Sequence, residues 1–127
     1  MGSFLLPAPI VPILLLTLSN IFMTFAWYGH LKFKSLPLST AILIGWGIAF
    51  VEYCFAVPAN RLGHGVYSAP ELKTLQEVIT LTVFGIFSIC YLKEALTLNH
   101  LFGYVLIFAG AFVVFKGPFS IQIFPLS

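Results

Sequence analysis

Four long runs of apolar residues dominate the pattern along the chain, separated by short stretches that contain proline, glycine and polar residues. Each run is close to the length of about 20 mostly apolar residues that a helix needs to cross a bilayer. Prolines fall mostly at the edges of the runs, where the missing N–H costs least, and we interpret them as helix boundaries. The pattern predicts four membrane-spanning helices over residues 12–31, 39–57, 72–91 and 98–116, with one long loop over residues 58–70.

The two ends of the chain are the least defined parts of this pattern. The first run has no Lys or Arg before it and is too long for a signal sequence, so we expect it to be retained as a span. The apolar core of the fourth run, residues 100–115, reaches bilayer length only if its helix begins near Thr97 or continues through Lys116. The final residues 120–127 are too few to cross, and we expect them to lie at the interface or to lack fixed structure.

The composition supports a single membrane domain over the whole chain. Of the 127 residues, 60% are apolar and 8% are charged, and Asp is absent, whereas soluble domains average roughly 25% charged residues. Lipid is therefore the expected surrounding, and the protein is predicted to be an all-α, multi-pass integral membrane protein. Ten charged residues leave no basic surface for nucleic acid.

Motifs for catalysis, cofactors or metals are missing from the sequence. Cys54 and Cys90 lie inside apolar runs without a C-x-x-C or zinc spacing, and we expect them to be buried free thiols. No hydrolase or nucleotide-binding motif is present, so the sequence favours a protein that is not an enzyme and has no cofactor or metal. The histidines also lack metal-ligand spacing, and surface or helix-capping positions are expected for His30, His64 and His100.

The Lys and Arg residues give no orientation signal. With four spans, three cations fall on each side of the membrane, whereas an excess normally stays cytoplasmic. This balance leaves two alternatives, which are a fixed orientation set by folding or partners, and insertion in both orientations with antiparallel pairing. The cations are Arg61, Lys73 and Lys116 on one side and Lys32, Lys34 and Lys93 on the other.

The first span carries a stripe of polar residues at helical spacing. Thr17, Asn20, Thr24 and Trp27 follow one another at intervals of three, four and three, which places them on one face. Asn20 falls close to the middle of the membrane. The stripe could join helices through hydrogen bonds worth roughly 0.6 kcal/mol each, or it could contact a solute.

Glu52 is the acidic residue of the second span, on the same face as several small residues. Small side chains let another helix approach closely, so we expect this face, and Glu52 with it, to point into the protein. A carboxylate inside a membrane costs roughly 2.5–3.5 kcal/mol on insertion scales and is a candidate proton carrier. The small residues on this face are Ala41, Gly45, Ala49 and Ala56.

Glu77 lies about five residues inside the third span, at a depth similar to that of Glu52, roughly 8 Å at 1.5 Å per residue. Two carboxylates that share one apolar site cannot both ionise cheaply, which would favour uptake of one proton. The alternative is a structural anchor, in which Lys73, one helical turn away, and Arg61 neutralise them.

The fourth span has glycines at intervals of seven residues, namely Gly103, Gly110 and Gly117. Such a stripe allows close contact with another helix, either from a second copy of the chain or from the same monomer.

Several segments resemble a known family. The segment Tyr91–Phe115, with Gly103 and Gly110, resembles the helix-pair signature of the drug/metabolite transporter superfamily. Within that superfamily the chain resembles a small uncharacterised four-helix bacterial family over residues 12–116. The segments that carry this likeness are SNIFMTFAWYGHLKF from Ser19, VEYCFAVPANR from Val51 and LQEVITL from Leu75.

The resemblance implies a four-helix bundle like that of the small multidrug resistance exporters, in a bacterial inner membrane. Those exporters work as antiparallel homodimers that exchange protons for cationic compounds, using a glutamate in the first helix followed by Thr one turn later. Here Asn20 and Thr24 hold these places, and Asn cannot carry a proton. Any coupling must therefore depend on Glu52 or Glu77.

These observations favour a small transporter of a polar or cationic solute that works as a homodimer, because four helices are too few to enclose a path. Glu52 and Glu77 would bind protons or solute, Asn20 and Thr24 would orient the solute, and the side chains of Trp27 and Tyr53 would offer ring faces to a cation. The alternative is a non-catalytic accessory or assembly subunit that docks onto a larger membrane complex.

Overall fold

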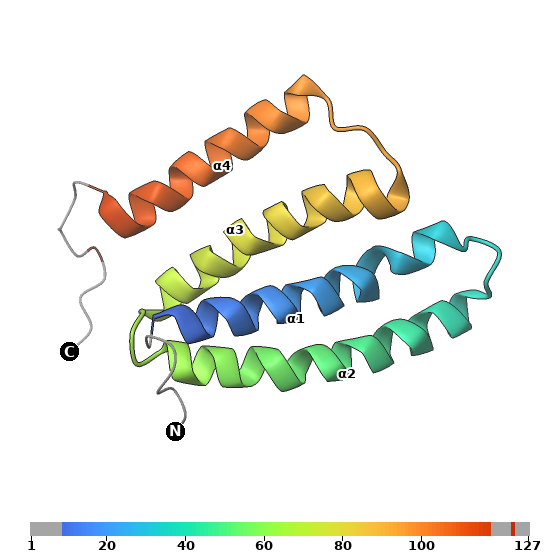
Figure 1. Ribbon diagram of the computed structural model, residues 1–127, viewed down its shortest axis with the longest axis horizontal. Coiled ribbons are helices and arrows are strands. Elements are labelled where there is room, and N and C mark those ends of the chain that lie inside the picture. Colours follow the sequence, from blue (N-terminus) through green and yellow to red (C-terminus); the bar gives the residue numbers. More distant parts are fainter. Residues whose placement is uncertain (1–8, 118–122, 124–127) are drawn as a thin grey trace.

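The structure is a computed structural model that describes residues 9–117 and residue 123, so the predicted C-terminal segment falls, apart from Ile123, outside the described residues. Within these residues the chain forms four long helices and two short helical segments (Figure 1). A 3₁₀ segment, η2, follows the first helix, and a π-helical segment, η3, continues the third. The elements are α1 Ile10–Tyr28, η2 Gly29–Lys32, α2 Leu38–Gly63, α3 Ala69–Phe87, η3 Ser88–Leu92 and α4 Leu98–Lys116.

All four helices are long and apolar enough to cross a membrane. Counted with their short extensions, the spans contain 23, 26, 24 and 19 residues in chain order. This confirms the predicted fold class, a four-helix membrane bundle, and the protein is an integral, multi-pass membrane protein.

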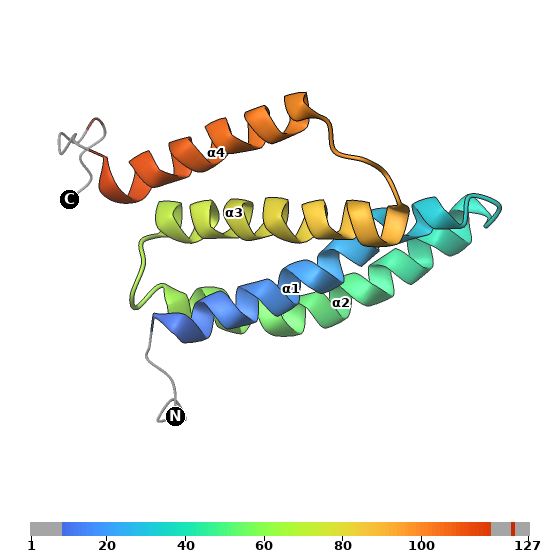
Figure 2. The ribbon, with the colours of Figure 1, turned by 45° about the horizontal axis from the view of Figure 1, so that its top comes forward.

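The helices are arranged around α1. Helix α1 packs along α2 on one side and against α3 on the other, whereas α4 packs against α3. Both ribbon views show α4 on the side of α3 that faces away from α1 and α2 (Figures 1 and 2). The three helices α1, α2 and α3 therefore form the packed unit, and α4 is attached along one side of it.

Side chains at the starts of α3 and α4 satisfy backbone N–H groups that have no partner within the helix. The Ser68 hydroxyl accepts from the N–H of Glu71, whose carboxylate accepts in return from the N–H of Ser68. Thr97 and His100 form the same reciprocal pair at α4. The capping position expected for histidine is confirmed at His100.

The prediction of a loop over residues 58–70 is wrong in extent. Helix α2 continues through Pro58 to Gly63, and α3 already begins at Ala69. The additional turn is stabilised by tertiary packing: Ala59 is fully buried, and a Cβ at Gly63 would lie 2.6 Å from the Leu72 side chain. Packing of this kind offsets the hydrogen bond that Pro58 cannot donate.

Aromatic rings pack together near the C-terminal ends of α1 and α3. The Phe25 ring meets those of Phe87 and Tyr91 edge-on, with ring centroids 5.0 and 5.1 Å apart. Tyr91 belongs to η3, where the regular α-helix has ended, and Lys93 then turns the chain in a left-handed conformation with φ of 62°. Edge-to-face and stacked rings contribute roughly 0.5–1.5 kcal/mol each beyond their buried area, so this cluster stabilises one end of the bundle.

Few apolar side chains are buried inside the monomer, and many large ones are exposed, such as Trp46 and Phe50 at 73% and 71%. Exposed apolar surface on this scale needs lipid or another protein to cover it. Cys54 and Cys90 are free, as expected, but both are exposed. The expectation of burial was wrong because an apolar run does not show which of its residues face the bundle.

Candidate functional site

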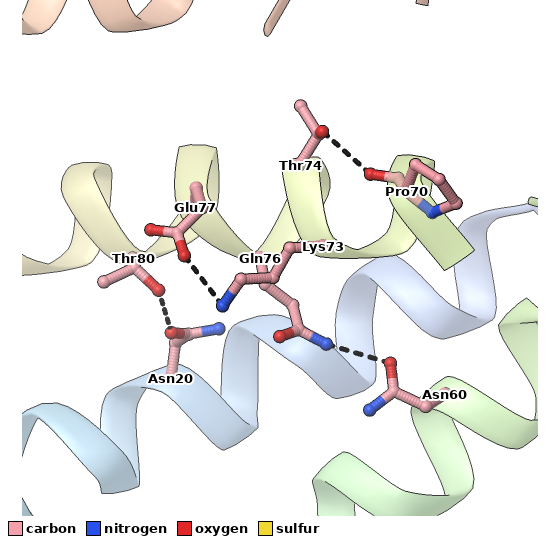
Figure 3. A network of polar contacts seen from close by, with 8 residues as sticks. All are labelled: Asn20, Asn60, Pro70, Lys73, Thr74, Gln76, Glu77 and Thr80. Atoms are coloured by element: carbon pink, nitrogen blue, oxygen red, sulfur yellow. Dashed lines mark hydrogen bonds and ion pairs between the residues drawn. The ribbon is translucent and has the colours of Figure 1, made fainter. Parts of the chain in front are cut away.

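Helix α1 buries its polar residues against the other two helices of the packed unit. Ser19, Asn20 and Thr24 are all buried, although they lie in the middle of a membrane span. The Asn20 amide donates to the carbonyl of Leu16 at 2.8 Å, and its side-chain oxygen accepts a hydrogen bond from the Thr80 hydroxyl of α3. Figure 3 shows Asn20 and Thr80 facing each other across the two helices. Helix-joining hydrogen bonds are therefore one function of this polar face.

Glu52 projects from α2 into the interior, as expected from the small residues on its face. Its side chain is buried, with 8% of the residue exposed. One carboxyl oxygen, Oε2, accepts from the Ser19 hydroxyl at 2.6 Å. The other, Oε1, is buried and has no hydrogen-bond partner among the described residues. A buried acceptor without a hydrogen bond destabilises the folded protein by roughly 1–3 kcal/mol, and by more when it is charged. Binding of a proton, or of a hydrogen-bond donor from a solute, would reduce this cost.

Glu77 is in a different environment. Its carboxylate pairs with the Lys73 ammonium one turn earlier on α3 at 2.9 Å, and both side chains are more than half exposed. An exposed pair at this spacing contributes only about 0.3–0.5 kcal/mol and is easily exchanged for other partners. Lys73 therefore pairs with Glu77, as in one of the two alternatives, whereas Arg61 and Lys73 form no ion pair with Glu52 within the described part of the chain.

A third hydrogen bond between helices links α2 to α3, near the C-terminal end of α2. The Gln76 amide donates to the side-chain oxygen of Asn60 at 2.9 Å. Figure 3 shows this pair beside the Lys73–Glu77 pair and the Asn20–Thr80 pair.

These side chains line one open cavity between α1, α2 and α3, which we call the polar groove. Its volume is about 510 Å³, within the range of roughly 300–1,000 Å³ that is typical of small-molecule sites. Glu52 and Glu77 both line it, so the structure brings the two acids to one cavity. Its polar residues are Ser19, Asn20, Glu52, Asn60, Lys73, Gln76, Glu77 and Thr80, and its aromatic residues are Trp27 and Tyr53.

The structure separates the candidate residues into two groups. Glu52, Glu77, Asn20, Trp27 and Tyr53 all line the groove. Thr24 does not line it and is 1% exposed, buried among the helices. The sequence shows that Thr24 lies on the polar stripe, but it does not show which side of α1 packs against the other helices.

Sequence reasoning did not single out the groove residues Ser19 and Asn60. Ser19 precedes Asn20 and so lies next to the polar stripe, which was the available signal. Asn60 was assigned to a loop because Pro58 was interpreted as the end of the second helix. Its neighbour in space, Gln76, comes from another helix, and no local pattern connects the two.

We predict that Thr80→Val lowers the free energy of unfolding by about 0.6 kcal/mol, and by no more than about 1.7 kcal/mol. The substitution keeps the shape of the side chain but removes the donor to the buried Asn20 oxygen. Unfolding in a mixed-detergent titration measures the change. Thr82→Val is the matched control, because the exposed Thr82 hydroxyl donates only to the Val78 carbonyl of its own helix. Equal stability of the two variants would contradict the prediction.

The glycines of the fourth span do not all share one environment. A Cβ at Gly103 or Gly110 would meet nothing within 4 Å, so these positions are not used for packing inside the monomer. Gly117 lies beyond the end of α4 as its C-cap, where a Cβ would collide with the carbonyl of Val113. Gly117 is therefore required by the local exit of the chain from the helix.

Comparison with known proteins gives one match. The family model with the description "Putative member of DMT superfamily (DUF486)" matches residues 12–115. No curated protein and no solved structure matches the chain. The matched region contains all four helices except the first two residues of α1 and the last of α4, and it contains every residue of the polar groove.

Proposed function

Since the chain belongs to the DUF486 family, whose description is "Putative member of DMT superfamily", we propose that it is a small transporter that moves a polar or cationic solute across the membrane. The family match supports a membrane transporter-like role at the level of the family and fits a protein that is not an enzyme. The proposal includes the class of solute, the coupling of transport to protons, and a location in a bacterial inner membrane.

The observation that carries the proposal is the unpartnered carboxyl oxygen of Glu52, a residue that lines the polar groove. The Ser19 hydroxyl satisfies only one of its two oxygens. When the carboxyl group is ionised, a cationic or hydrogen-bond-donating solute can bind to the free oxygen. When the solute leaves, a proton can replace it. Competition between proton and solute for one carboxylate would couple their movements when the groove opens to only one side of the membrane at a time.

The remaining groove residues have supporting roles in this proposal. The Asn20 side chain, held by Leu16 and Thr80, would orient the solute. Trp27 and Tyr53 would offer ring faces to a cation, an interaction worth roughly 0.5–2 kcal/mol. Glu77 would accept solute or proton after releasing Lys73, at little cost because their pair is exposed. Thr24, which is buried outside the groove, would act indirectly by supporting α1.

The experiment that tests this function is solute flux into liposomes. The purified protein is reconstituted and supplied with labelled ammonium compounds, amino acids and sugars, with and without a pH gradient. Uptake of one class above the level of empty liposomes, accelerated by the gradient, supports the proposal. Uptake that equals the background for the whole panel would reject transport of these classes.

A homodimer is part of the proposal because the groove is open on one side and four helices do not enclose a path. Gly103 and Gly110 leave α4 with an open surface that a second copy can approach closely. The balanced Lys and Arg counts support insertion in both orientations, which would make the dimer antiparallel. A C-terminal tag accessible from both membrane sides is expected, and single-sided access would reject the antiparallel arrangement.

We predict that Gly110→Leu weakens the dimer by roughly 1–3 kcal/mol, because a larger side chain prevents close approach of the helices. Light scattering of the detergent-solubilised protein over a concentration series measures the shift from dimer to monomer. Ala109→Leu, one residue earlier in α4, is the control for added bulk on this helix. A dimer that withstands Gly110→Leu would exclude this position from the interface.

The second candidate function is that of an accessory subunit, and the open surface of α4 also suits this function. Co-purification from native membranes distinguishes the two. A foreign protein in stoichiometric amount would favour docking onto a larger complex, whereas a self-dimer with measurable flux favours transport.

A further inference from the structure

A second cavity lies at the end of the bundle where α1 connects to α2, and the proposed transport function does not use it. Its volume is about 380 Å³, and we call it the loop pocket. Phe25 and Gly29 from the α1 side, Ile44 and Gly45 from α2, and Tyr91 from η3 form its walls. Among its lining residues, only His30 and Tyr91 carry polar side-chain atoms.

The loop pocket and the polar groove have no lining residue in common. Met23 and Trp27 line the groove, whereas Phe25 and Gly29 line the loop pocket. An occupant of the loop pocket therefore does not block the groove.

Two lysines of the connection between α1 and α2 lie next to residues that line the loop pocket. The Lys32 ammonium lies 4.5 Å from the centroid of the Tyr91 ring, which forms one wall, and donates to the Tyr91 carbonyl at 3.0 Å. Lys34 lies in the same connection, between the lining residues Phe33 and Leu36. Lys32 and Lys34 are exposed and form no ion pair over residues 9–117.

An apolar cavity with two lysines in the adjoining connection, at the end of a membrane-spanning helix, matches the two parts of a phospholipid. We propose that the loop pocket binds one acyl chain of an anionic phospholipid and that Lys32 and Lys34 bind its phosphate. The headgroup must carry a net negative charge, because the ammonium of a zwitterionic headgroup would lie beside two lysines. Each lysine near the membrane surface contributes roughly fivefold to the affinity for anionic lipid.

Lipid retention by the purified protein in a neutral detergent tests the proposal. Native mass spectrometry is carried out with phosphatidylglycerol, with phosphatidylcholine of the same chains, and with soluble glycerol phosphate. We expect one phosphatidylglycerol per chain to be retained at concentrations where the other two are lost. Equal retention of the two lipids would overturn the charge selection, and equal binding of glycerol phosphate would overturn the role of the acyl chain.

Two sets of variants locate the site. Lys34→Gln is expected to weaken phosphatidylglycerol binding roughly fivefold, and the double variant with Lys32→Gln roughly thirtyfold. Lys116→Gln, at the far end of α4, is the control and should change nothing. Ile44→Trp fills the loop pocket and is expected to abolish retention, whereas Ile86→Trp adds the same bulk at an exposed position of α3. Retention that withstands Ile44→Trp would show that the lipid binds elsewhere.

Discussion

Glu52→Gln is expected to abolish proton release when solute is added to the detergent-solubilised protein, and to reduce solute flux in liposomes to the level of empty vesicles. The amide is close in size and shape to the carboxyl group and can still accept the hydrogen bond from Ser19. It cannot bind or release a proton, and it offers no negative charge to a cation at the position of Oε1. A dye-based measurement of pH in weakly buffered detergent detects the proton release directly.

Two further variants separate the role of Glu52 from a general loss of charge. Glu94→Gln removes an exposed carboxylate in the connection before α4 and should leave proton release and flux unchanged. Glu77→Gln removes the exposed partner of Lys73 and is expected to weaken flux without abolishing it. Unchanged proton release by folded Glu52→Gln, with the elution volume and thermal stability of the wild type, would remove Glu52 from the mechanism.

Gly45→Val is expected to lower the free energy of unfolding by about 1–3 kcal/mol, the typical cost of overpacking a close contact. A Cβ at position 45 would lie 3.0 Å from the Ala26 carbonyl oxygen, and this neighbour is backbone that cannot rotate away. The two additional methyl groups of Val would force α1 and α2 apart. Thermal unfolding in detergent, followed by circular dichroism, measures the loss.

Gly47→Val is the matched control for this prediction. Position 47 lies two residues further along α2, and a Cβ there would meet nothing within 4 Å. The same substitution is therefore expected to change stability only slightly at this position. Equal losses at positions 45 and 47 would contradict the prediction, because only position 45 has the close contact with α1.

Much of the fold follows from hydropathy alone. In lipid, a backbone N–H or C=O without a partner is costly, so a long apolar segment has almost no alternative to a helix. The inward direction of Glu52 was also predictable, because Gly45 and the alanines on its face permit close packing. The boundary at Pro58 was not, because burial of Ala59 and Gly63 stabilises a turn that proline alone disfavours.

The site was predictable only in part. Asn20, Glu52 and Glu77 were identified because a polar group inside a membrane is costly and therefore conspicuous in an apolar sequence. Lys73 was identified as a partner of Glu77, because it lies one turn earlier on the same helix, but the partners of Asn20 and Glu52 on other helices were not identified. Ser19 lies 33 residues from Glu52, and Asn20 lies 60 residues from Thr80, and no periodicity along one helix fixes such pairs.

The sequence by itself determined the number of spans, their helical form and the chemical types of the polar groups within them. It did so because the free energies of transfer into lipid act residue by residue and need no knowledge of neighbours. Only the tertiary structure decided that Glu52 keeps one oxygen free, and that Thr24 lies outside the groove. These outcomes depend on how α1, α2 and α3 rotate and slide against one another, and that packing is a property of all three helices together.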